Sequence, residues 1–415
     1  MLLFSRLRRF GLTDTKGRRA KLVDFIVDLP AEGYPPVTHI LFRHTSHELE
    51  VLPWEAVVSV DHSARQIKVK DIEAGTLAPP ESLKKKVLMT DIDDAMVLDL
   101  KHHRAARANG LLLKEENGTL LLGGVDTSFS AILRHITGGR FSYVPDATVH
   151  DWVDIEFLRG HPQAVRAGML YRHQIAQLPA GEIARLASQL PYMHAAELVT
   201  LLPDALAINT LEAMTARRRL QVFEELDDDR ALRLLEIMAP DVAADLMGVL
   251  QTEAMQGYLD RLPKIQSERI VDLLSFPEHT VGGIMTNDIV FAPMRLTIAE
   301  AREKLRERLK EPDFVYLIFI VDDETTKRQQ GIISIRDLLT GDDNRTLEEI
   351  MDKKVPTLDA LESAEEAAFK VIESQLAALP VVGPNGQLLG AVTVDAAVLQ
   401  AAPEAWGSQA PRIFS

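Results

Sequence analysis

The chain has 415 residues and an apolar share of 46%, which is enough for about three domains of roughly 150 residues each. It contains no cysteine, which excludes disulfides and thiolate metal sites and fits a reducing cytoplasm. Acidic residues outnumber basic residues 61 to 46, for a net charge of −15. This excess argues against nucleic acid as a partner, because phosphates need basic side chains to neutralise them.

Membrane spans and enzyme motifs are both missing from the sequence. The strongest apolar run, residues 314–321, is far shorter than the roughly 20 residues a span needs, and residues 1–10 lack the apolar core of a secretory signal. We find no phosphate-binding loop, no Gly-x-Ser-x-Gly elbow and no His-Glu-x-x-His helix. We expect a soluble cytoplasmic protein that is not an enzyme. A position at the periphery of the inner membrane stays open.

Residues 1–158 form two copies of one strand pattern, residues 1–78 and 80–158. Alternating apolar runs separated by turn residues predict strands at residues 22–28, 37–42, 51–54, 66–69, 95–100, 110–113 and 119–125. A tryptophan segment occupies the same place in each copy, at Trp54 and Trp152. The strand order and these segments resemble tandem PRC-barrel domains, small β-barrels used for docking. The resemblance implies a membrane protein or a large assembly as a partner.

The middle of the chain, residues 160–276, has a strict twelve-residue repeat. Prolines, caps and turn formers recur every twelve residues from Pro179 to Ser275, with short apolar-periodic pieces between them. A proline or a cap at each start limits a helix to two or three turns. Helices this short cannot bury an apolar face alone, so neighbours must stack. The repeat predicts a compact right-handed α-superhelix.

This block is similar to the cytosolic N domain of MgtE-type magnesium transporters. The likeness continues through residues 274–278 into Gly282–Thr286, the family's junction between the helical domain and a CBS pair. The resemblance implies Mg²⁺ ions that bridge these domains. The clearest ligand candidates are Asp241 and Asp245, because a spacing of four places both carboxylates on one helix face, where a cation can screen them. The alternative is an Asp241 that stabilises the helix dipole beside a solvated Asp245.

Two further copies of one pattern follow, at residues 277–345 and 346–402, before a tail at 403–415. Each has a charged helix, an apolar strand, a Gly-led strand and a second helix, with the apolar strands at residues 317–322 and 379–382. They resemble a CBS-domain pair, which implies an adenosine nucleotide such as ATP as a ligand. The first copy keeps the implied hydroxyl and carboxylate, Ser334 and Asp337. Helix capping by Asp337 is the alternative.

Other residues depart from the transporter pattern or lack matched partners. Ala396 and Leu399 stand where transporter relatives carry further acids, and His279 stands where an acid is usual. The chain then ends without a connecting helix. His102 and His103 lack matched partners, so we interpret them as exposed or core histidines.

The fold class we expect is multidomain α+β, with tandem PRC-like barrels, a short-helix α-superhelix and an α/β CBS pair. The function we expect is a magnesium-responsive regulator, with an adenosine nucleotide as a possible second ligand. The alternatives are the gating subunit of a transport system whose spans lie on another chain, and a docking scaffold with a vestigial sensor. We also predict a homodimer through the CBS pair, because Ala364, Ala367 and Ala368 allow close approach.

Overall fold

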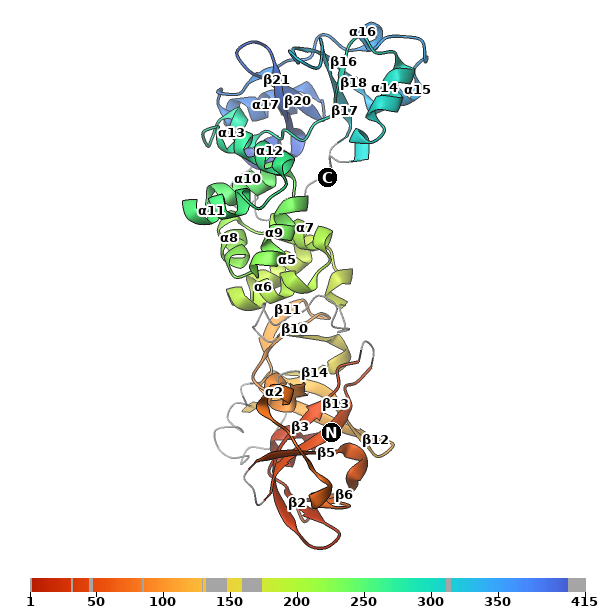
Figure 1. Cartoon of the computed structure of the whole chain (residues 1–415), viewed down its shortest axis with the longest axis vertical. Helices are drawn as coiled ribbons and strands as arrows, with labels where there is room; N and C mark the ends of the chain where they lie inside the picture. The colour runs from red at the N-terminus through yellow and green to blue at the C-terminus, as the bar shows by residue number, and fades with distance from the viewer. Residues whose placement is uncertain are drawn as a thin grey trace. The chain divides into compact units, whose positions relative to one another are not determined.

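A computed structural model describes residues 2–30, 33–44, 48–83, 86–128, 130–131, 148–158, 174–310 and 315–401. It divides into two compact units, Met1–Ala207 and Ile208–Ser415, coloured along the chain in Figure 1. The predicted tail, residues 403–415, and residues 160–173 of the predicted helical region lie outside the described residues. No helix in the described part of the chain is both long and apolar enough to cross a membrane.

The first part of the chain is rich in strands, as predicted. Its first copy comprises β1 (Leu2–Leu3), α1 (Phe4–Leu7), β2 (Gly11–Asp14), β3 (Arg19–Val27), β4 (Val37–Arg43), β5 (Leu49–Pro53), η1 (Trp54–Ala56), β6 (Val57–Asp61), β7 (Gln66–Val69), η2 (Ile72–Ala74) and β8 (Thr76–Leu77). After α2 (Pro80–Leu83), the second copy comprises β9 (Val87–Leu88), α3 (Met89–Ile92), β10 (Met96–Asp99), β11 (Arg104–Arg107), β12 (Gly110–Glu116), β13 (Thr119–Asp126), β14 (Val149–Asp151), η4 (Trp152–Asp154) and β15 (Ile155–Leu158).

The two copies exchange their leading strands. The first copy's β1 pairs with β12 of the second copy, and the second copy's β9 pairs with β3 of the first. The sheets run in the order β6-β7-β2-β3-β4-β5-β8, β1-β12-β13-β14 and β11-β10-β15. One apolar core therefore runs through both copies. The PRC-barrel assignment and the boundaries at residues 78 and 158 stay predictions.

The tryptophan segments occupy matching places, as the sequence indicates. Trp54 opens η1 and Trp152 opens η4, and both side chains lie in the shared core. The Trp54 indole Nε1 donates to the carbonyl oxygen of Gly118 in the second copy, at 3.1 Å. A buried indole needs such a partner for its N–H. The tryptophan thus also fixes the contact between the copies.

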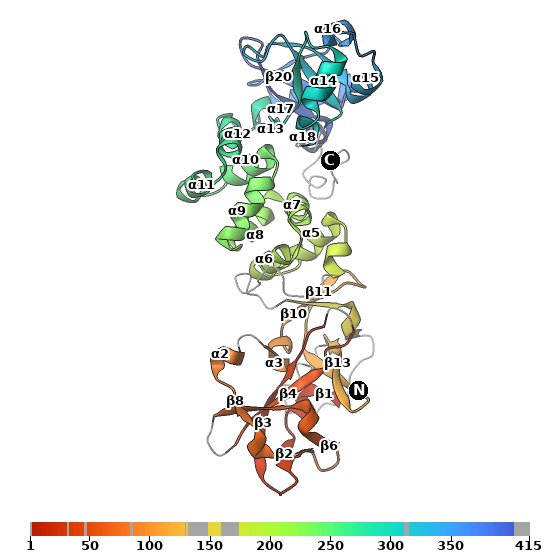
Figure 2. The ribbon, with the colours of Figure 1, turned by 45° about the vertical axis from the view of Figure 1, so that its right-hand side comes forward.

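The twelve-residue repeat sets where each helix of the helical run begins. After η6 (Gln174–Gln177), every helix begins one residue after a repeat position: α5 (Ala180–Ser188), α6 (Tyr192–Leu201), α7 (Asp204–Glu212), α8 (Ala216–Glu224), α9 (Asp228–Ile237), α10 (Pro240–Gly248), α11 (Thr252–Leu259) and α12 (Lys264–Leu274). The Thr215 side chain caps α8, and Asp227 caps α9. Helix α10 packs against α12 (Figures 1 and 2). The right-handed superhelical sense stays a prediction.

The C-terminal part repeats one α/β motif, again as predicted. After α13 (Val281–Ile284), each half has two parallel strands and one antiparallel strand: β16 (Phe291–Pro293), β17 (Leu317–Val321) and β18 (Gln329–Ser334), then β19 (Leu358–Asp359), β20 (Ala378–Val382) and β21 (Leu388–Thr393). The helices are α14 (Ile298–Leu305), η7 (Arg308–Lys310), α15 (Ile335–Thr340), α16 (Leu347–Ile350), α17 (Ala364–Ser374) and α18 (Val394–Ala401).

The two halves pair with each other through their leading segments. Thr286, before the first strand of the first half, bridges to Ala391 on β21, and Asp352, before the first strand of the second half, bridges to Ile332 on β18. One core cluster takes side chains from both sheets, including Phe319 and Ala378. The exchange explains why two copies are needed: each half completes the edge of the other.

Glycine permits close approach at the junction before the pair. Gly282 and Gly283 lie within α13, and neither has a positive φ. A Cβ at Gly282 would lie 2.3 Å from the Phe276 ring, and one at Gly283 would lie 2.7 Å from the carbonyl oxygen of Pro277. These glycines are therefore required because a side chain at either position would clash with the segment before α13.

Candidate functional site

Helix α10 presents the two predicted Mg²⁺ ligands near an acidic cavity. Pro240 stands at the first helical position of α10, where its missing N–H and fixed φ suit the start of a helix. Asp241 follows in the first turn and Asp245 lies one turn later, half-buried and exposed respectively. The Thr286 hydroxyl, from the segment after α13, donates to Asp241 Oδ1 at 3.2 Å. Asp241 thus links the helical run to the C-terminal pair.

A cavity of about 740 Å³ opens beside these carboxylates. Its walls come from α8, α10, α12, α13 and α18 and the segments on either side of α13. Five carboxylates line it: Asp241, Asp245, Glu278, Asp288 and Asp395. Both predicted metal-ligand candidates, Asp241 and Asp245, therefore line the same cavity as Asp395 from α18.

The charge balance of the cavity is strongly negative. Arg219 is the only arginine or lysine among the lining residues in the described part of the chain. Asp288 forms an ion pair with Arg269 at 2.9 Å, so part of its charge is compensated. Carboxylates that line one cavity repel one another unless a cation screens them. The cavity is therefore suited to cations.

The cavity also has the right chemistry for a hydrated ion. Mg²⁺ dehydrates reluctantly and is usually held by one or two carboxylates while it keeps several waters. Within the described residues, no three of the lining carboxylates bring ligand oxygens within 4.8 Å of one another. An open cavity with dispersed acids fits a cation that keeps part of its water shell.

Comparisons with known proteins agree with this arrangement of domains. The family model for the MgtE intracellular N domain matches residues 178–279, and the model for the CBS domain matches residues 281–342 and 347–398. The chain carries an MgtE N domain and a CBS pair. The helical run from α5 onward, its junction at α13 and the repeated α/β halves are these domains in family order.

Curated relatives and a solved structure match the same part of the chain. The magnesium transporter MgtE of Thermus thermophilus is 32% identical over 158 residues, which is 36% of this chain and 34% of that protein. The magnesium transporter MgtE of Bacillus subtilis is 29% identical over 137 residues, 33% of this chain and 30% of that protein. The crystal structure of the cytosolic domain of the Mg²⁺ channel MgtE in complex with ATP has a TM-score of 0.51, with 28% identity over 54% of this chain and 90% of that one.

The N domain and CBS pair are thus homologous to the cytosolic part of MgtE, while the chain spans about a third of the length of those curated relatives. The matched families are regulatory and CBS domains of transporters, and not enzyme families.

Sequence reasoning missed three of the cavity acids. Glu278 and Asp288 lie in the segments flanking α13, and Asp395 lies in the first turn of α18, after the Gly-led strand of the second CBS half. Ala396 and Leu399, which stand in place of family acids, line the same cavity. Asp395 supplies a carboxylate one position before Ala396, so the acidic character of this helix start is kept in part.

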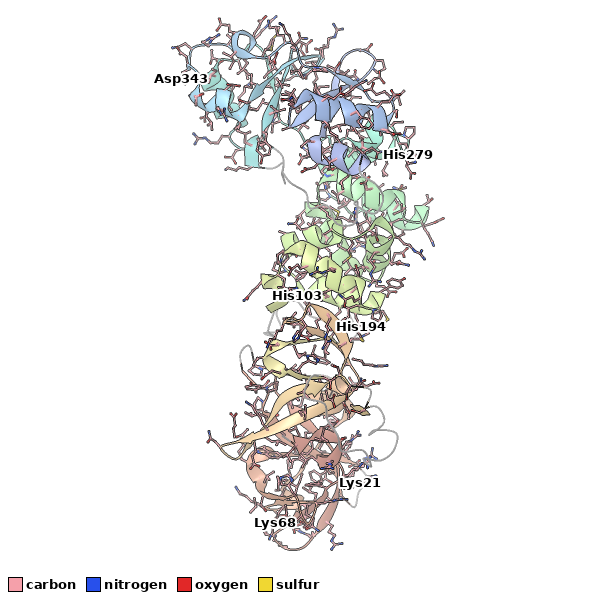
Figure 3. The ribbon with its side chains drawn as sticks, turned by 180° about the vertical axis from the view of Figure 1, so that it is seen from behind. Lys21, Lys68, His103, His194, His279 and Asp343 are labelled. Atoms are coloured by element: carbon pink, nitrogen blue, oxygen red, sulfur yellow. The ribbon has the colours of Figure 1, made fainter. Side chains whose placement is uncertain are left out.

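His279 also lines the N-domain side of the cavity and is marked in Figure 3. Its backbone has φ 65°, in the left-handed region that histidine adopts more readily than bulky residues do. The imidazole is exposed. Histidine at this position supplies no carboxylate to the cavity.

The candidate nucleotide residues of the first CBS half bond to each other. Ser334 is the N-cap of α15: its hydroxyl accepts from the Asp337 N–H at 3.1 Å, and Asp337 Oδ2 accepts from the Ser334 N–H at 3.1 Å. The Ser334 hydroxyl also donates to the same carboxylate oxygen at 2.7 Å. This is a capping box, so the capping role is present in the structure. The two side chains lie together, as a shared ligand would require.

Replacing Asp337 by alanine should separate capping from nucleotide binding. The variant should lower the thermal midpoint of unfolding by about 2–4 °C, the effect of losing one helix cap. If Asp337 also holds ribose, the heat of ATP binding should vanish with it. Glu300→Ala is the matched control, since Thr297 and Glu300 form the equivalent box on α14. The control should lose stability and keep the ATP heat; ATP heat that persists in Asp337→Ala would remove the nucleotide role.

A histidine cluster in the N-terminal unit corrects the interpretation of His102 as a histidine without matched partners. The structure places the His102 ring against Asp99 and near His150. Burial alone would raise the pKa of Asp99, yet hydrogen bonds from the His102 N–H and ring, with His150 nearby, outweigh burial and lower that pKa. Burial lowers the pKa of His150, and Arg104 lowers it further. His102 is exposed, as interpreted, but the absence of partners is wrong, because Asp99 three residues before it and His150 on β14 both lie against it.

Proposed function

We propose that this chain is a magnesium-responsive regulatory protein whose sensor is the acidic cavity between α10 and the CBS pair. The observation that carries the proposal is that Asp241 and Asp245 line one cavity together with three further carboxylates. Among the described lining residues, Arg219 is the single arginine or lysine. The homology to the cytosolic part of MgtE magnesium transporters supports Mg²⁺ as the ion. The match to an intracellular domain supports a cytoplasmic location.

The response would arise from charge repulsion across the cavity. Asp241 and Asp245 belong to α10 of the N domain, whereas Asp395 belongs to α18 of the CBS pair. Without a cation, these acids repel and favour separation of the two domains. A Mg²⁺ ion binds the closed arrangement better and shifts the population towards it. The ligand thereby changes the surface offered to a partner.

An adenosine nucleotide is the second ligand that we propose. The MgtE cytosolic domain of known structure was solved with ATP, and Ser334 and Asp337 provide a hydroxyl and a carboxylate at the start of α15. A nucleotide at that place would contact the first CBS half and favour one arrangement of the CBS pair over the other. The Asp337→Ala experiment described above tests it.

We further propose a docking role for the strand-rich region and a homodimer through the CBS pair. The prediction that an alanine face forms the dimer contact is wrong, because Ala364, Ala367 and Ala368 are fully buried within the chain. The exposed apolar side chains of α17 are instead Phe369, 53% exposed, and Ile372, 41% exposed. They lie three residues apart on one helix face. A second copy that covers this face would bury both.

Charge on that face should therefore dissociate the dimer. Phe369→Asp should convert the full-length protein from dimer to monomer in light scattering, because a buried carboxylate without a partner strongly disfavours association. Ile265→Asp is the matched control, since Ile265 is 70% exposed on α12, in the N domain. A monomeric wild type would contradict the homodimer, and equal dissociation by both variants would place the interface elsewhere.

The experiment that tests the proposed function is a Mg²⁺ titration followed by small-angle X-ray scattering. The radius of gyration should fall at millimolar Mg²⁺ in the wild type and should not respond when Asp241 and Asp245 are replaced by asparagine. Transport by a complex with a separate membrane chain would also require this sensor. A docking scaffold would not.

A further inference from the structure

Three potential metal ligands meet at one end of the strand-rich region. Asp99 ends β10, His102 lies in the hairpin turn between β10 and β11, and His150 lies on β14 of another sheet. Their ligand atoms all lie within 4.8 Å of one another. In the described part of the chain, no other three His, Cys, Asp or Glu residues meet this condition. The cluster is far along the chain from Asp241 and Asp245.

The two imidazoles point the same ring nitrogen at the same carboxylate oxygen. Asp99 Oδ2 lies 2.8 Å from His102 Nδ1 and 2.9 Å from His150 Nδ1. In a tetrahedral centre with bonds of about 2.0–2.1 Å, ligand atoms are separated by about 3.3 Å. Each carboxylate–imidazole pair therefore needs to open by about half an ångström to hold an ion between its two ligand atoms.

Two of the three ligands are buried and the third, His102, is exposed, so the cluster is open to solvent on one side. The Asp99 and His150 side chains are 1% and 4% exposed, whereas the His102 side chain is 57% exposed. The Thr127 hydroxyl lies 3.1 Å from His150 Nε2. Its oxygen can accept a hydrogen bond from that nitrogen once Nδ1 binds an ion, which is the usual outer partner of a metal-bound histidine. Water can fill the remaining position on the exposed side.

Arg104 contacts both Asp99 and His150. Its Nη2 lies 2.9 Å from His150 Nε2, and its Nε lies 3.3 Å from Asp99 Oδ2. A divalent ion beside a guanidinium is unfavourable, so Arg104 must leave when the ion enters. The Arg104 side chain is 48% exposed and can turn towards solvent. Arg104 is therefore a competitor for the site.

We propose that Asp99, His102 and His150 form a transition-metal site that takes Zn²⁺ or a similar first-row ion, with water as a further ligand. Two imidazoles and one carboxylate suit such ions, whereas Mg²⁺ prefers an all-oxygen shell. The site is thus chemically distinct from the acidic cavity and does not depend on its function.

A metal here would fix the hairpin that contacts the first helix of the N domain. His103, marked in Figure 3, forms an ion pair with Glu182 of α5 at 3.2 Å, if protonated. The Ala105 N–H donates to Gln189 Oε1, at the end of α5, at 3.0 Å. Both contacts come from residues close to His102 along the chain. Metal binding at His102 would order the turn that carries them.

Calorimetry with Zn²⁺ on the full chain tests the site, in buffer with millimolar Mg²⁺ to occupy oxygen sites. The wild type should bind one tight equivalent, and His102→Asn should weaken that binding by about 100-fold or more, since it removes a direct ligand. His103→Asn is the matched control: it changes the neighbouring histidine and should keep wild-type affinity. Arg104→Gln should bind Zn²⁺ more tightly than the wild type, because the competing cation is gone.

A second readout separates ligand loss from misfolding. Bound Zn²⁺ should raise the thermal midpoint of the wild type and of His103→Asn but not of His102→Asn, because a ligand stabilises only the state that binds it. The visible absorption of bound Co²⁺ should report tetrahedral coordination in the same two proteins. Absence of a tight equivalent in the wild type, or equal weakening by His102→Asn and His103→Asn, would overturn the proposal.

Discussion

Replacing Gly390 by alanine should destabilise the CBS pair and weaken its coupling to α10. A Cβ at this position would lie 2.4 Å from the Thr286 carbonyl oxygen and 3.1 Å from Met285 Sδ. The oxygen belongs to backbone, so the two segments must separate, which costs about 1–3 kcal/mol by overpacking. Thr286 also donates to Asp241, so the same displacement should loosen the cavity. Denaturation and Mg²⁺ titration measure the two effects.

The control for Gly390→Ala is another glycine with room beside it. Gly257 lies within α11, and a Cβ there meets nothing within 4 Å. Gly257→Ala should therefore stabilise the protein by about 0.5–1 kcal/mol, because alanine is the better helix former. Gly331→Ala should resemble Gly390→Ala, since its Cβ would lie 2.5 Å from the Asp352 carbonyl oxygen. Equal stability of all three variants would contradict the close approach.

The helical run could be predicted from sequence because its signals are local. Each helix starts directly after a repeat position, such as Pro191 or Pro263, whose residue ends the helix before it. The twelve residues from one such position to the next leave room for one short helix. The strands and the two α/β halves could be located for a similar reason. Apolar runs such as Leu317–Val321 have strand length and strand composition.

The pairing between copies could not be predicted from the same signals. The exchange of β1 and β9, and the bridge from Thr286 to Ala391, join segments far apart in the chain. No local sequence pattern indicates which distant segment a strand will pair with. The roles of Gly282 and Gly283 show the same limit, because their need for space depends on Phe276 and Pro277 folding back over them.

The candidate sites could be predicted in part. Asp241 and Asp245 lie one helical turn apart, so their place on one helix face follows from sequence, but the cavity that they share with Asp288 and Asp395 forms only through the fold. Asp99 lies only three residues before His102, but His150 on β14 reaches this pair only through the fold, so local spacing could not reveal the full cluster. The alanines of α17 have the pattern of a contact face, yet that face packs inside the chain.

Removal of two charges from α10 should abolish the response to Mg²⁺. Asp241→Asn with Asp245→Asn keeps side-chain size and removes the repulsion that the ion relieves. Asp260→Asn with Asp272→Asn is the matched control, because it removes the same charge from residues outside the cavity lining. The control should respond as the wild type does. An equal loss in both double variants would mean that net charge, and not the cavity, governs the response.

The most direct test of the magnesium-responsive account is the radius of gyration of the full-length protein, measured by small-angle X-ray scattering with and without millimolar Mg²⁺. Ionic strength must be held constant, because general screening also weakens repulsion between exposed charges. The account predicts a smaller radius with Mg²⁺ for the wild type and the Asp260/Asp272 control, and no change for the Asp241/Asp245 variant. A wild-type radius that is unchanged by Mg²⁺ would contradict the sensor function and favour a docking scaffold.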